Sequence, residues 1–294
     1  MAKSTLHTSR YWADWSTRDF EQLRQCGEVQ EWIAVLPLAA TEQHGPHLPL
    51  KVDSALVDGV VAACLPHVQN NAKVLFLPTL TVGFSPEHSA FAGTLTLKAE
   101  TVIRLWTDIA ESVAASGFKK LVLLNAHGGQ VGFMDIVGRD LRARLGMLVY
   151  SVNWFNLPLQ DAQGNNLNDL FSAHEHRFGV HAGEIETSMM LVLDPCNVQM
   201  QHAQKFASTS EQRARQYAIL GDGKTAKLAW QMQDYNPSGA VGDAANACPD
   251  KGRQVILAAG LALAKLLAEL QDLPLDILRQ NPMPGEGARK QPTA

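Results

Sequence analysis

The sequence predicts an α/β fold with a mainly parallel sheet and helices on both of its faces. Short apolar runs rich in Val, Ile and Leu alternate with longer segments of helical period. Such alternation is typical of βαβ units, in which a helix returns the chain to start the next parallel strand. Histidine-containing polar loops directly follow three of the apolar runs. A functional site is therefore expected beyond the carboxyl ends of those strands.

The expected strands are continuous apolar runs, which indicates burial on both faces of the sheet. They cover residues 32–38, 73–77, 119–124 and 146–152. Between them, apolar residues recur at three- and four-residue spacing, as they do on the buried face of a helix. The expected helices cover residues 53–68, 99–116 and 130–145.

The pattern loosens after residue 152. Polar residues 156–176 and the Gly-, Asn- and Pro-rich residues 221–252 predict loops. Further helices are expected from about 183 to 195, over 201–220 and over 253–271. No repeat or linker divides the chain, so residues 1–294 are expected to form a single domain, with a disordered tail after residue 282.

Composition excludes several classes of function. With 46% hydrophobic and 18% charged residues, the 294-residue chain can bury a large core. A net charge of −4 predicts no nucleic-acid partner, because phosphate binding needs a basic face. No membrane partner is expected, since no apolar stretch approaches the ~20 residues of a span. Without a secretory signal or a CxxC pair, the chain is expected to be cytoplasmic, with four reduced cysteines.

The first polar loop carries Glu42 and His44. In an extended chain, residues two apart point to the same side, so both side chains can reach one ion. Asp53 stands where the next helix is expected to begin. On its own, Asp53 is equally consistent with a helix cap and with a carboxylate that bridges two cations. The presence of Glu42 and His44 favours the bridging role.

Two further loops supply candidate ligands. A lone histidine at a strand end is more often structural, but the glycines after His127 let the backbone approach a bound group closely, which favours a ligand. Glu184 and Glu186 lie about 200° apart on a helix, so only one of them is expected to face the site. The residue types do not choose between the two. Carboxylate and imidazole without thiolate suit Zn²⁺, Mn²⁺ or Fe²⁺.

Four motifs together resemble the creatininase family of amidohydrolases: TEQHGPHLPL followed by Val52 and Asp53, GFSPEHSAFAGT, NAHGGQ and HAGEIETS. The resemblance covers about residues 32–195. It implies a three-layer α/β/α sandwich, two divalent metal ions per chain, with Zn²⁺ preferred, and commonly a homohexamer. It also implies that Glu42, Asp53 and His127 hold one metal, and that His44 and the other oxygen of Asp53 hold the second.

Two departures indicate that the chain is not creatininase itself. Creatininase has a carboxylate ligand where this chain has Gly129, and Glu184 is the expected replacement, with Glu186 supporting catalysis. Creatininase also surrounds its ligand with tryptophans, whereas residues 177–180 contain none and Trp154 is the nearby candidate. The substrate is therefore not expected to be creatinine.

The expected activity is metal-dependent hydrolysis of a small cyclic amide or formamide by a metal-bridged hydroxide. His181 matches a histidine at the reacting centre of creatininase and is the expected general acid, unless it only hydrogen-bonds near the helix start. Glu87 and His88 are expected to contact substrate, or equally to form a surface pair. The alternative activities are ring opening of a cyclic keto-polyol and metal binding without turnover.

Overall fold

The computed structural model describes residues 8–279 and contains a four-stranded parallel sheet. Its strands are β1 (Ile33–Leu38), β2 (Val74–Phe76), β3 (Lys120–Asn125) and β4 (Leu148–Asn153). They lie in the order β2-β1-β3-β4, with Ile33 of β1 opposite Val74 of β2 and Lys120 of β3. Every residue of the two central strands, β1 and β3, is buried. The parallel sheet expected from the continuous apolar runs is confirmed.

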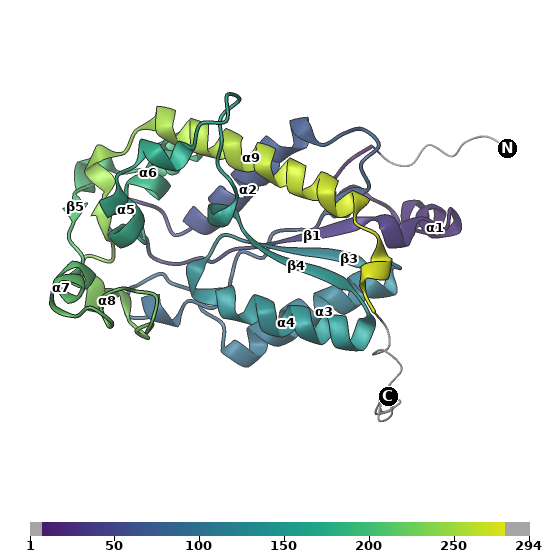
Figure 1. Cartoon of the computed structure of the whole chain (residues 1–294), viewed down its shortest axis with the longest axis horizontal. Helices are drawn as coiled ribbons and strands as arrows, with labels where there is room; N and C mark the ends of the chain where they lie inside the picture. Colours follow the sequence, from purple (N-terminus) through teal and green to yellow (C-terminus); the bar gives the residue numbers. More distant parts are fainter. Residues whose placement is uncertain (1–7, 280–294) are drawn as a thin grey trace.

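Helices cover both faces of the sheet, as Figure 1 shows. On one face lie α2 (Val52–Cys64), α6 (Glu184–Leu193) and α9 (Pro249–Asp272). On the other lie α1 (Thr17–Gln25), α3 (Ala99–Ala115) and α4 (Val131–Leu145). Alternate side chains of β1 enter the two cores: Ile33 and Val35 pack with α2 and α9, whereas Ala34 and Leu36 pack with α3 and α4. The three-layer α/β/α sandwich is confirmed.

The loop expectations after residue 152 are only partly right. The polar segment 156–176 runs into α5 (Ala173–Phe178), and segment 221–252 contains α8 (Met232–Tyr235) and β6 (Gly242–Asp243). The helix expected over 201–220 is shorter: β5 (Lys205–Phe206) precedes it and α7 spans Thr209–Gln216. A capping box at Ser208 sets the start of α7, because it satisfies backbone N–H groups that begin a helix. The tail after 282 lies outside the described residues.

Helix α9 is the one described helix that is long and apolar enough to cross a membrane, with a mean hydropathy of 1.4. By length and composition, therefore, the expectation that no apolar stretch approaches a membrane span was wrong. Half of that apolar window is buried inside the fold, and the Lys120 ammonium at the start of β3 donates to the carbonyl oxygens of Leu270 and Leu273 at its end, both at 2.7 Å. Helix α9 is thus a core helix of this domain.

The order of the strands creates a crevice at one end of the sheet. The chain passes from β1 outward to β2 and then returns to the other side of β1 to form β3. The connections after β1 and β3 therefore leave in opposite directions, which opens a ligand site beyond their carboxyl ends. In Figure 1 those ends point toward α5, α6, α7 and α8.

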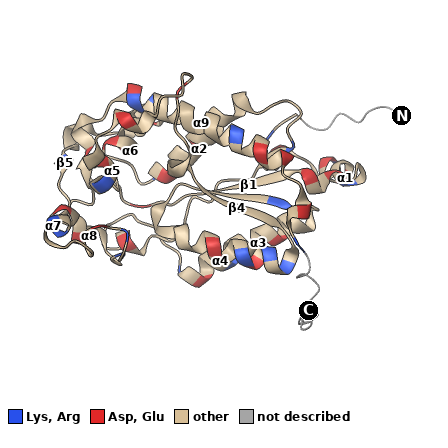
Figure 2. Cartoon of the chain, in the orientation of Figure 1, with Lys and Arg blue, Asp and Glu red and all other residues tan. Residues whose placement is uncertain are grey.

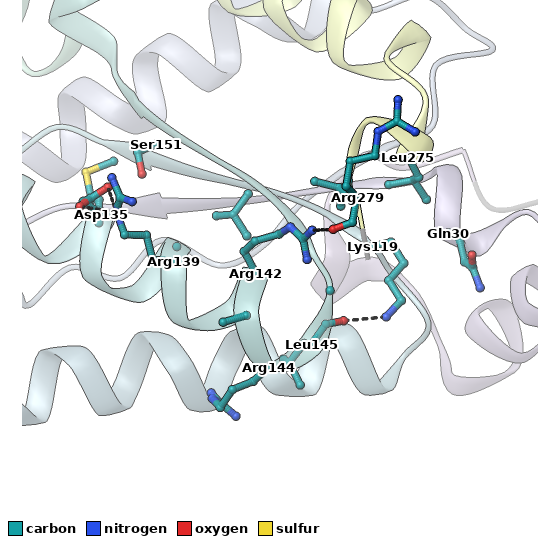
Figure 3. A pocket seen from close by; sticks show the side chains of 16 residues that line it. Gln30, Lys119, Asp135, Arg139, Arg142, Arg144, Leu145, Ser151, Leu275 and Arg279 are labelled. Carbon is teal, nitrogen blue, oxygen red and sulfur yellow. Dashed lines mark hydrogen bonds and ion pairs between the residues drawn. The ribbon is translucent and has the colours of Figure 1, made fainter. Parts of the chain in front are cut away.

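Charged side chains of both signs occur along α3, α4 and α9 (Figure 2). Several of these Lys and Arg side chains line a cavity of about 1030 Å³ between α4, β4 and the residues after α9 (Figure 3). There, Lys119 donates to the carbonyl oxygen of Leu145 and Arg142 to that of Arg279, both at 2.9 Å. No histidine is among the described residues that line this cavity. The histidines instead gather at the opposite end of the sheet.

Candidate metal centre

The loop after β1 holds Glu42 and His44, which are both 1% exposed. The backbone N–H of Glu42 donates to the carbonyl oxygen of Leu50, and a left-handed glycine, Gly45, turns the chain. The Nδ1–H of His44 donates to the carbonyl oxygen of Glu42 at 3.0 Å. The lone pair of His44 is therefore at Nε2, the nitrogen that faces the cluster.

Asp53 occupies the first turn of α2 and faces two histidines with its two oxygens. Its Oδ1 lies 3.6 Å from Nε2 of His44, and its Oδ2 lies 3.5 Å from Nδ1 of His127. The carboxylate thus stands between the imidazoles, where a bridging ligand would stand. Residue 51, not Asp53, is the N-cap of α2.

His127 is held at the end of β3 by Asn125. The amide of Asn125 donates to the carbonyl oxygen of His127 at 2.7 Å, and its Oδ1 accepts from the backbone N–H of His127 at 3.1 Å. The Nε2–H of His127 donates to the carbonyl oxygen of Phe84 at 2.9 Å. Its Nδ1 consequently carries the lone pair, 3.3 Å from Oε1 of Glu42.

Glu186, and not Glu184, faces the cluster. The expectation that Glu184 is the metal ligand is therefore corrected. Oε2 of Glu186 lies 4.0 Å from Nε2 of His44 and accepts the backbone N–H of Ala182. Glu184 points away and forms a partly buried ion pair with Lys251 at 2.5 Å. The two carboxylates diverge because residues two apart on α6 project to opposite sides of the helix.

The donor set fits divalent metal ions. Three buried atoms of this cluster have no hydrogen-bond partner among the described residues: Glu42 Oε2, His44 Nε2 and Asp53 Oδ2. Unpaired buried polar atoms are costly, and a cation that they surround removes that cost. Two groups of potential ligands, each within 4.8 Å, share Asp53. One is Glu42, Asp53 and His127; the other is His44, Asp53 and Glu186.

The packed carboxylates favour positive charge at both histidines. Burial alone would lower the pKa of His44, but its interaction with Asp53 raises it to about 9. Burial likewise acts against the charged form of His127, yet Glu42 and Asp53 raise its pKa to about 10. Burial raises the pKa of Glu186 to about 7. These shifts show that the cluster favours positive charge, and pKa values perturbed to this extent are typical of functional sites.

His181 stacks between two other histidines, with its ring centroid 4.2 Å from that of His44 and 4.3 Å from that of His88. Its Nε2–H donates to the carbonyl oxygen of Gln43 at 2.8 Å, which leaves the lone pair at Nδ1. Burial, followed by the charges of His44 and His88, holds the pKa of His181 well below its ordinary value. The neutral ring can accept a proton at Nδ1. It must do so before it can act as the expected acid.

Glu87 and His88 are 9% and 1% exposed, so the alternative of a surface pair is wrong. The amide N–H of Gln43 donates to Nδ1 of His88 at 2.7 Å, and Oε1 of Gln43 accepts from the backbone N–H of Gly45. The proton of His88 is therefore on Nε2, 3.3 Å from Oε1 of Glu42. His88 orients Glu42, and Gln43 fixes the tautomer of His88.

The carboxylate of Glu87 fills the space beside Gly129. Its Oε1 lies 3.5 Å from Nε2 of His127. A Cβ at position 129 would lie 1.8 Å from that oxygen and 2.6 Å from Nε2 of His127. Glycine is thus required here by the side chains of Glu87 and His127.

A cavity of about 820 Å³ opens onto the cluster. Glu42, Asp53, His127, His181 and Glu186 form its polar end, together with Glu87 and His88. Apolar walls come from Phe84, Trp154, Phe155, Leu159, Ile185 and Trp230. Trp154 thus lies near the site, as expected, whereas Trp230 was missed because it is far from every motif in the sequence.

A model of the creatininase family, described as creatinine amidohydrolase, matches residues 13–267. The Mycobacterium tuberculosis mycofactocin precursor peptide peptidase is 30% identical over 232 residues, which cover 76% of this chain and 80% of that protein. The Thermotoga maritima 3-dehydro-scyllo-inosose hydrolase is 24% identical over 285 residues, with coverage of 89% and 86%.

Solved structures share the fold. A crystal structure from Bacteroides fragilis, described as a putative creatinine amidohydrolase, superposes with a TM-score of 0.66 at 25% identity, covering 86% of this chain and 95% of that one. A zinc–zinc form of a creatininase mutant gives a TM-score of 0.66 at 20% identity, covering 90% and 98% of the two chains. A manganese form of creatininase gives 0.66 at 21% identity, with coverage of 89% and 98%.

Proposed function

This chain belongs to the creatininase family of hydrolases, and on that premise we propose that it cleaves an amide C–N bond at a centre of two divalent metal ions. The observation that carries the proposal is the position of Asp53, whose two oxygens face His44 and His127 separately. Glu42, Asp53 and His127 would hold one ion. His44, Asp53 and Glu186 would hold the other.

The donor set and the relatives support Zn²⁺ or Mn²⁺ as the bound ions, with Fe²⁺ compatible with the same ligands. Such ions, when bound, lower the pKa of water to near neutrality and polarise a carbonyl oxygen. The chain itself supplies the orientation of the ligands, because His88 orients Glu42.

His181 is the residue that moves the proton. Its Nδ1 holds a lone pair and lies 3.9 Å from Oε1 of Glu42, so it takes a proton from the attacking water. The same nitrogen then gives that proton to the leaving nitrogen of the amide. General base and general acid are therefore one side chain at successive stages.

A second candidate function is hydrolytic ring opening of a cyclic keto-polyol. It is favoured by the similarity to the 3-dehydro-scyllo-inosose hydrolase, which extends over 89% of this chain. That reaction would release no amine. Metal binding without turnover is a weaker candidate, because binding alone does not require a proton-accepting histidine beside the ligands.

One experiment tests the proposal directly. Purified protein should contain about two divalent ions per chain by elemental analysis, and amide substrates should release a primary amine or ammonia in proportion to metal content. A metal-free preparation with full activity would contradict the two-metal proposal. Turnover of keto-polyols without amine release would establish the second candidate instead.

The likeness to the family also leads us to propose a homo-oligomer, a hexamer by resemblance, located in the cytoplasm. All four cysteines are free thiols, as is usual in a reducing compartment. A small molecule is the proposed partner, with neither nucleic acid nor a membrane.

A further inference from the structure

Trp230 forms an aromatic platform beside the cluster. Its ring stacks on Tyr235 with a centroid distance of 4.7 Å and an interplanar angle of 26°. The guanidinium carbon of Arg213 lies 4.9 Å from the Tyr235 ring centroid on α8, so the stack has a third layer. A ring held in this way loses little conformational freedom when a ligand packs against it.

A single side chain, that of His88, lies between Trp230 and the proposed metal ligand Glu42. Trp230 meets His88 edge to face, with centroids 6.3 Å apart at 81°, and His88 in turn contacts Glu42 at 3.3 Å. Trp230 is only partly buried and lines the 820 Å³ cavity. A ligand whose reacting group lies at the cluster can therefore extend against the indole.

Other parts of the cavity lining are also apolar. Trp154 and Phe155 follow β4, and Leu159 and Ile185 contribute aliphatic surface. Phe155 is 41% exposed, which is high for a large aromatic side chain. The indole N–H of Trp154 is buried, and it has no partner among the described residues. The cavity therefore offers aromatic and aliphatic contact area beyond Trp230.

Resting on the proposed metal centre, we infer that the scissile amide belongs to a larger substrate, and that this substrate carries a flat apolar group that packs against Trp230. A cavity of about 820 Å³ has the size of sites that enclose drug-sized ligands. A small cyclic amide or formamide would leave most of it empty.

The test compares hydroxamates that share one metal-binding group. Acetohydroxamic acid and 2-naphthohydroxamic acid are titrated calorimetrically into metal-loaded protein, wild type and Trp230→Ala. We expect the naphthyl compound to bind wild type about tenfold more tightly, because aromatic contact adds to apolar burial. Trp230→Ala should remove most of that gain and leave acetohydroxamate binding unchanged. Trp230→Phe, which keeps a flat ring, should retain part of it.

Tyr217→Ala is the matched control, because Tyr217 is an aromatic residue that is 51% exposed and does not line the cavity. This variant should bind both hydroxamates as wild type does. A naphthyl gain that is absent, or that survives in Trp230→Ala, overturns the inference. 2-Naphthamide, which cannot chelate, separates the two proposals. If it binds through Trp230 while acetohydroxamate fails to bind, the metal centre is wrong and the aromatic subsite stands.

Discussion

His44 and His127 offer different ring nitrogens to the same cluster, because in each a backbone carbonyl holds the other nitrogen. Glu42 supplies that carbonyl for His44, and Phe84 supplies it for His127. Each carbonyl thus determines which ring nitrogen offers its lone pair to a cation once the other proton of the ring has been released. The proposed ligand geometry is thus determined by main-chain positions as much as by the side chains themselves.

The roles of Glu184 and Glu186 can be separated by isosteric substitution. Glu186→Gln should lower the metal content by about one ion per chain, since the residue lies with His44 and Asp53. Glu184→Gln should keep the metal and cost ~1.5–3 kcal/mol of stability, because it weakens the charge-assisted bond to Lys251. Elemental analysis and denaturant unfolding measure the two effects. If Glu184→Gln lost metal and Glu186→Gln did not, Glu184 would be the ligand, as first expected.

The lack of space for a side chain at Gly129 leads to a second prediction. Gly129→Ala should displace Glu87 and His127 and weaken metal binding, since overpacking a tight site typically costs ~1–3 kcal/mol. Adding Glu87→Ala should recover part of the loss by removing the nearer obstacle. The recovery is partial, because Nε2 of His127 remains close.

Gly128→Ala provides the control for that pair, because a Cβ there meets nothing within 4 Å. Metal affinity of wild type, Gly129→Ala, Glu87→Ala and the double variant gives a double-mutant cycle. Equal effects of the two glycine substitutions would contradict the proposed packing.

At the scale of elements, one buried carboxylate joins three segments around His181. Glu175 of α5 is 1% exposed. Its Oε1 accepts the backbone N–H of Glu184 at 2.6 Å, and its Oε2 accepts that of Asp243 at 2.8 Å. Three glycines leave room for it: a Cβ at Gly179, Gly183 or Gly242 would lie 2.2–2.6 Å from its carboxyl group. Helix α6 therefore starts against α5 and β6.

Glu175→Gln should destabilise the protein by ~1–3 kcal/mol, because an amide cannot accept from both backbone N–H groups and leaves one unsatisfied. It should also weaken metal binding, since Glu186 lies in the first turn of α6. Glu100→Gln, in the exposed first turn of α3, is the matched control. Thermal unfolding and metal affinity together test this role, and a variant with both unchanged would exclude it.

Short elements are the part of the fold that could not be predicted from the sequence. Strands β1 and β3 and helices α3 and α4 have long, periodic patterns, so they were predicted to within about two residues. Elements such as α8 and β6 are short, and their conformation depends on contacts with distant segments. Glu42, His44, Asp53 and His127 were predicted to converge because their loops follow adjacent parallel strands or begin the next helix. Tertiary packing decides which of the two glutamates of α6 faces the cluster, and it also brings Trp230 close to the site.

At the scale of the whole molecule, the sheet has an open edge at β4. Exposed apolar side chains accompany it, with Tyr150 at 42% on the strand and Ile136 at 52% on the neighbouring α4. Unpaired edges and apolar surface are usually covered in the native assembly. We expect light scattering after gel filtration to give a multiple of the 32.0 kDa chain mass. A monomer at micromolar concentration would contradict the proposed oligomer.

The potential ligands are widely separated along the chain, from Glu42 at the end of the first strand to Glu186 in α6. An unfolded chain cannot hold them together, so the proposed ions would bind the native state far better than the denatured ensemble. Metal uptake would therefore be coupled to global folding, and by mass action each proposed ion, when free at 100 times its Kd, would add about 2.7 kcal/mol to the unfolding free energy. Chelation would act as a denaturing stress as well as a loss of activity.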